Sequence, residues 1–115
     1  MIATNYMVIF RGMLCDEGLA PEEIQTVASQ WTAWFDRLTQ QGKIKSSRTF
    51  VNQGKIVSCK NGQVVIDDCF AETDETIFGY VLLEANSLAG AVKITKECPG
   101  LSNGARAEIR PILEL

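Results

Sequence analysis

The chain has 115 residues and a mass of 12.7 kDa, so we expect residues 1–115 to form a single domain with its own core. Apolar residues make up 46% of the chain and charged residues 22%, as in ordinary globular domains. The net charge of -3 and the pI of about 4.9 argue against a nucleic-acid partner, which requires clustered Lys and Arg side chains.

No stretch is as long and apolar as a membrane helix, and residues 1–10 lack the basic start of a signal peptide. We therefore expect a cytoplasmic protein with no membrane partner. The four cysteines are scattered and the chain contains no histidine. Zinc sites need clustered Cys and His ligands, and the clustered carboxylates, which could suit Mg²⁺ or Ca²⁺, lack EF-hand spacing, so we expect no metal and no cofactor. Without histidine, any proton chemistry would depend on Asp, Glu, Tyr, Lys or Cys.

The first predicted element is a strand over residues 6–10, which is apolar on both faces and therefore central in a sheet. Pro21-Glu22-Glu23 is typical of a first helical turn, because proline fits there and acidic residues favour the helix dipole. Apolar residues then recur at helical spacing and predict a helix over residues 21–41 that ends at Gly42. They are Ile24, Val27, Trp31, Trp34, Phe35 and Leu38. We interpret the two tryptophans as core or dimer packing rather than as the wall of a ligand site.

Residues 43–50 predict a connector, with a short strand around residues 49–51. Two β-like runs, residues 55–60 and 63–67, flank Asn61-Gly62. Asn-Gly between such runs is the strongest short hairpin signal, because both turn residues need a positive φ.

A further strand is predicted over residues 77–85 and a second helix from Asn86 or Ser87 to about Glu97. Cys98-Pro99 ends that helix, since proline disfavours helical geometry in the residue before it. Its predicted inner face consists of Leu88, Ala91, Val92 and Thr95. The last strand covers residues 106–112, where charged residues alternate with small or apolar ones and form a solvated face.

This order of elements predicts an α+β fold, a ferredoxin-like sandwich with an added β-hairpin. Both helices would cover the same face of the sheet, and no further predicted element is left to cover the other. A second copy of the same sheet is the natural cover, so we expect a homodimer.

The residues from Asp67 to Glu75 resemble the Asp-Gly-Pro-Phe-Ala-Glu-Thr-Lys-Glu signature of the YCII-related (DGPF-domain) family. Gly79-Tyr80, Cys98-Pro99 and Glu108-x-Arg110-Pro111 extend the resemblance over nearly the whole chain. It implies a dimeric α+β barrel, in which two ferredoxin-like units join their sheets around a cavity. That superfamily includes isomerases, small monooxygenases and proteins without an assigned role.

The signature is altered in three places, where Asp68, Cys69 and Asp74 replace its glycine, proline and lysine. Some YCII-type members pair a histidine with the signature aspartate as a proposed catalytic dyad. Because this chain has no histidine, the resemblance does not carry that dyad over to Asp67.

Asp67 matches the signature aspartate and has two interpretations. Repulsion from Asp68 would raise its pKa and make it a general acid or base, whereas a capping role would have it accept backbone N–H bonds at the turn. The neighbouring carboxylates disfavour a reactive thiolate at Cys69. The candidates for a ligand pocket are Arg48, Phe70, Glu72, Tyr80 and Arg110. An arginine in such a pocket would favour a small anionic organic ligand.

Three functions are compatible with these features. The first is a dimeric module that binds a small molecule with little or no catalysis. The second is a cofactor-free isomerase, lyase or hydrolase acting on a small organic acid, with Asp67 as acid or base. The third is an interaction partner of a transcription regulator, because DGPF-type domains resemble domains found beside sigma factors.

Overall fold

The computed structural model describes residues 4–12, 20–50, 54–68 and 77–113, and they form an α+β fold. The elements are β1 (Thr4–Arg11), α1 (Pro21–Gln40), β2 (Ile44–Thr49), β3 (Lys55–Lys60), β4 (Gln63–Asp68), β5 (Ile77–Ala85), α2 (Leu88–Thr95), the 3-10 helix η1 (Pro99–Asn103) and β6 (Arg106–Pro111). Four strands form an antiparallel sheet in the order β2-β5-β1-β6, while β3 and β4 pair only with each other. The predicted ferredoxin-like class with an added hairpin is confirmed.

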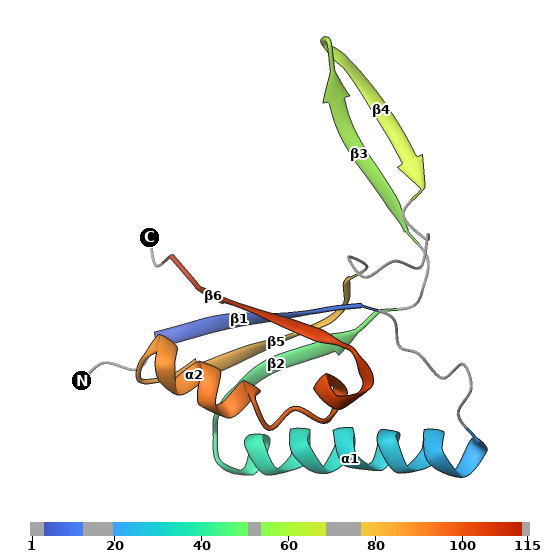
Figure 1. Ribbon diagram of the computed structural model, residues 1–115. Helices are drawn as coiled ribbons and strands as arrows, with labels where there is room; N and C mark the ends of the chain where they lie inside the picture. The colour runs from blue at the N-terminus through green and yellow to red at the C-terminus, as the bar shows by residue number, and fades with distance from the viewer. Residues whose placement is uncertain (1–3, 13–19, 51–53, 69–76, 114–115) are drawn as a thin grey trace.

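Both helices lie on one face of the four-stranded sheet (Figure 1). The strands alternate accordingly: Tyr6, Val8 and Phe10 of β1 are buried beneath the helices, and so are Val81 and Leu83 of β5. The residues between them point to the opposite face, because successive side chains in a strand alternate. The core of the domain therefore lies between the sheet and the two helices.

Aromatic rings fill the centre of this core. The ring centroid of Phe10 lies 5.3 Å from that of Trp31 and 5.8 Å from that of Phe78. Trp34, which is only 3% exposed, packs edge-on against Phe10. Edge-to-face pairs of this kind add to the free energy gained by burial. The predicted core role of the two tryptophans is confirmed, although Ile24, at the outer end of α1, is 39% exposed.

Several element boundaries differ from the sequence-based expectation, and that of β2 differs most. β2 begins at Ile44 instead of near Thr49, because its pairing with β5 overrides the weak strand propensity of Ser46 and Ser47. α2 ends at Thr95, two residues before the predicted end.

The inner face of α2 is also partly different. Ala91 and Thr95 are buried as predicted, but Leu88 is 47% exposed. Leu88 is the first residue of a helix of eight residues, and Ile94 packs against the core near the other end. The N-cap is Ser87, whose Oγ accepts a hydrogen bond of 3.0 Å from the amide of Gly90.

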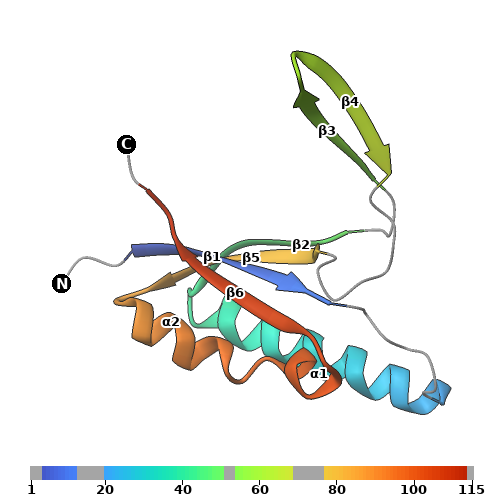
Figure 2. The same ribbon diagram turned by 45° about the horizontal axis from the view of Figure 1, so that its top comes forward.

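The β3–β4 hairpin has the predicted turn. Asn61 and Gly62 have φ values of 53° and 80°, as the Asn-Gly turn requires. The hairpin extends away from the four-stranded sheet, on the side opposite the helices (Figures 1 and 2). Within the described residues, no other helix or strand packs against it.

We predict that Gly100→Ala destabilises the fold, because a Cβ at residue 100 would overlap the indole of Trp31. Overpacking of a well-packed core costs roughly 1–3 kcal/mol of unfolding free energy. Urea denaturation followed by circular dichroism measures this loss. In a Trp31→Leu background the same glycine change should cost much less, and an equal cost in both backgrounds would contradict the proposed overlap.

Candidate functional site

The face of the sheet opposite the helices, here called the open face, has an apolar centre. Met7 and Ile9 of β1 lie beside Leu82 and Tyr80 of β5, respectively, and all four are half-buried. β1 was predicted to be apolar on both faces, but none of its residues was named as a site. The available signal was that second apolar face, which becomes informative once the register with β5 is known.

The strand register arranges the open face in rows. One row runs from Arg48 on β2 through Tyr80 and Ile9 to Glu108 on β6. The adjacent row contains Ser46, Leu82, Met7 and Arg110. Three of the predicted pocket residues, Arg48, Tyr80 and Arg110, therefore share this face, but Arg48 and Arg110 belong to opposite edge strands.

The cations at the β6 edge are paired. Glu108 accepts hydrogen bonds from Nε of Arg110 at 2.7 Å and from Nε of Arg11 at 3.2 Å. The bond from Arg110, followed by the bond and charge of Arg11, holds the pKa of Glu108 below its usual range. The same contact raises the pKa of Arg110. Both arginines at this edge are therefore held by the same carboxylate, which balances the charge of only one of them.

The β2 edge is different. Arg48 is exposed, and its Nη1 donates a 2.6 Å hydrogen bond to the backbone carbonyl of Ser47. Among the described residues it has no carboxylate partner. Its cross-strand neighbour Tyr80 lies beside the half-exposed ring of Phe50, with 6.1 Å between the ring centroids. Arg48 and Tyr80 are thus cross-strand neighbours on the open face, and an arginine beside an aromatic residue is a suitable contact for an organic anion.

Asp67, the candidate acid or base, lies elsewhere in the fold. It is on β4 opposite Ile56 and is exposed. The hairpin that carries it is not part of the four-stranded sheet, so the described residues do not bring Asp67 together with the arginines of the open face. Phe70, Glu72 and Cys69 lie outside the described residues.

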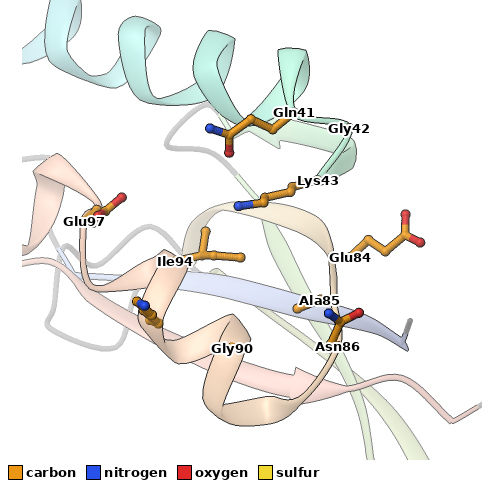
Figure 3. A pocket seen from close by; sticks show the side chains of 10 residues that line it. Gln41, Gly42, Lys43, Glu84, Ala85, Asn86, Gly90, Ile94 and Glu97 are labelled. Carbon is orange, nitrogen blue, oxygen red and sulfur yellow. The ribbon is translucent and has the colours of Figure 1, made fainter. Parts of the chain in front are cut away.

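A separate cleft of about 580 Å³ lies on the helix side of the domain (Figure 3). It is lined by Gln41, Gly42, Lys43, Glu84, Ala85, Asn86, Gly90, Lys93, Ile94 and Glu97. Two of its carboxylates are in ion pairs. Glu84 Oε2 lies 3.0 Å from Nζ of Lys45, and Glu97 Oε2 lies 3.5 Å from Nη2 of Arg37. The cleft has few apolar walls, whereas small-molecule sites are mostly apolar with a few polar groups. We therefore regard the open face as the better candidate for a ligand site. No signal in the sequence had pointed to this cleft.

Metal-binding and membrane-spanning features were also sought in the part of the chain that the structure describes. Three or more His, Cys, Asp or Glu side chains are nowhere grouped as metal ligands within residues 4–12, 20–50, 54–68 and 77–113. In the same residues, neither α1 nor α2 combines the length and the apolar character needed to cross a membrane.

The two cysteines of the described part have opposite environments. Cys98 is 4% exposed, and burial raises its pKa to about 11, against the partial opposition of hydrogen bonds from the backbone of Gly100 and Leu101. Cys59 is exposed on β3. Since the thiolate is the reactive form, Cys98 is a core residue rather than a nucleophile.

We predict that Cys98 makes stability depend on alkaline pH. Its thiol is more acidic in the unfolded chain, near pKa 9.0, than in the folded protein, near 11. The folded state is therefore favoured below pH 9, and this advantage, roughly 2–3 kcal/mol, is lost as the pH rises from 9 to 11. Urea denaturation at pH 8 and pH 11 tests this. A Cys98→Ala variant should lose less stability over that range, and an equal loss in both proteins would refute the prediction.

The comparison with known families agrees with the fold. The model of the YCII-related domain matches residues 6–115, which is nearly the whole chain. No individual curated protein matches the sequence. The match includes the open face, the hairpin and the segment with the altered signature. The chain therefore belongs to the YCII-related family.

Proposed function

We propose that this protein is a homodimeric module that binds a small organic anion on the open face, with Arg48 as its cationic contact. The observation that carries the proposal is that Arg48, which has no carboxylate partner among the described residues, is the cross-strand neighbour of Tyr80, whose ring packs against that of Phe50. An arginine presents a planar fork of donors that matches a carboxylate, and the two rings provide an apolar surface for the rest of the ligand.

The dimer part of the proposal rests on the apolar centre of the open face. Met7, Ile9, Tyr80 and Leu82 form a continuous surface that neither helix covers. Contiguous apolar surfaces of this kind usually mark an interface. A second copy facing the first would cover this surface and enclose Arg48 near its margin, where loss of water strengthens an ion pair with the ligand.

The state of the carboxylates favours binding over catalysis. In the described part of the open face, the carboxylate of Glu108 is held by two arginines. A carboxylate held in an ion pair is a weak base, because the neighbouring cation stabilises its charged form. The ligand-binding function therefore needs only Arg48 and the aromatic rings. The cytoplasmic location expected from the sequence stays a prediction.

We predict that Arg48→Gln weakens the binding of benzoate, used as a probe with one carboxylate and one aromatic ring. Loss of a charge-assisted hydrogen bond costs about 1.5–3 kcal/mol, so the dissociation constant should rise about tenfold to a hundredfold. Calorimetric titration of both proteins measures the change. Arg48 is exposed, so the variant should keep the stability of the parent protein.

The matched control is Arg37→Gln, which removes another exposed arginine, one that pairs with Glu97 on the helix side. Benzoate affinity should stay unchanged in that variant. The changes in amide chemical shifts on addition of benzoate, measured by NMR, then locate the probe. Shifts at Arg48 and Tyr80 support the proposal, whereas shifts confined to Lys43 and Lys93 would place the anion in the cleft and overturn it.

A further inference from the structure

The β3–β4 hairpin has one apolar face and one polar face. Its register sets Val57 opposite Ile66 and Cys59 opposite Val64, so these four side chains share a face, together with Lys55 at the base of the hairpin. The other face consists mainly of polar residues: Ser58, Lys60, Gln63 and Asp67, with Ile56 and Val65. An amphipathic hairpin of this kind is typical of one that packs against something on its apolar side.

That apolar face is uncovered in the single chain. Val57, Val64 and Ile66 are 65%, 71% and 65% exposed. Apart from each other, β3 and β4 contact no helix or strand in the part of the chain that the structure describes. An isolated two-stranded hairpin is at best marginally stable in water, so packing against another surface would stabilise it.

The shape of the chain leads to the same conclusion. A compact domain of this length has a radius of gyration of about 13 Å. The observed radius is 16.2 Å, and the molecule measures 46 by 46 by 19 Å. The hairpin that extends from the sheet accounts for the difference (Figures 1 and 2). The single chain therefore lacks the compactness of a finished domain.

The occupant of this apolar face follows from the area that a dimer needs. In a sheet, neighbouring strands lie about 4.8 Å apart and each residue lengthens a strand by about 3.3 Å. One face of a sheet of four strands, each six residues long, therefore has an area of roughly 400 Å². Stable interfaces bury about 800 Å² on each partner. The hairpin adds two strands, and it rises on the side of the sheet opposite the helices, which the second copy of the proposed dimer would cover.

We propose that the apolar face of the β3–β4 hairpin, formed by Val57, Cys59, Val64 and Ile66, is a dimerisation arm that packs against a second copy of this chain. In a two-fold dimer each copy contributes one arm and receives one, so both apolar faces are covered. This inference rests on the dimer of the proposed function and goes beyond it, because sheets that meet face to face do not require an arm.

The test compares two aspartate variants of neighbouring valines on β4. Val64→Asp puts a charge on the apolar face and should weaken the dimer about a hundredfold, since an unpaired charge in an interface is strongly unfavourable. Val65→Asp puts the same charge on the polar face and should change the dimer dissociation constant less than about threefold. Sedimentation equilibrium of each full-length variant measures both constants. Tryptophan fluorescence of Trp31 and Trp34 verifies that the four-stranded domain remains folded.

Labelling of Cys59 gives a second, independent measurement in the unmodified protein. Its reaction with iodoacetamide, followed by mass mapping of the Cys59 peptide, should slow at least about tenfold when the protein concentration exceeds the dissociation constant.

The outcomes separate the two proposals. Equal dimer constants for the parent protein and Val64→Asp would overturn the arm but keep the dimer and the Arg48 site. A monomeric parent protein would overturn the dimer and the arm together. A dimer with unprotected Cys59 and a foreign protein bound at the hairpin would overturn the second copy as occupant.

Discussion

Both helices of this protein pack on the same face of a four-stranded antiparallel sheet, and the rest of the structure depends on that arrangement. The cluster around Phe10, Trp31 and Trp34 fixes it, because these rings fill the space between α1 and the sheet. The opposite face keeps a half-buried apolar centre. A partly apolar sheet face of this kind is typical of an interface, and this property connects the fold to the proposed function.

Charge pairing divides the open face into two parts. Glu108 holds both Arg11 and Arg110 at one edge, while at the other edge Arg48, the cross-strand neighbour of Tyr80, pairs with no carboxylate of the described residues. The hypothesis of an enzyme with Asp67 as acid or base needs that carboxylate near a bound anion. In the described residues, Asp67 belongs to the separate hairpin. A binding module therefore requires fewer conditions than an enzyme does.

Much of the fold followed from local patterns. The Asn61-Gly62 turn, the α1 stripe and the cap at Ser87 each have a short-range physical cause, and each prediction was confirmed. β2 was predicted poorly, because its serines form a strand only through pairing with β5. The same limit applies to the site. Arg48 and Tyr80 were named from the sequence, but their contact depends on register between strands distant along the chain.

Sedimentation equilibrium of the full chain, over micromolar to millimolar concentrations, tests the central claim most directly. If a second copy covers the open face as proposed, the species in solution has twice the mass of 12.7 kDa. A mass of 12.7 kDa across the whole range would contradict it. In that case, the apolar centre of the open face would remain exposed to water in the functional protein.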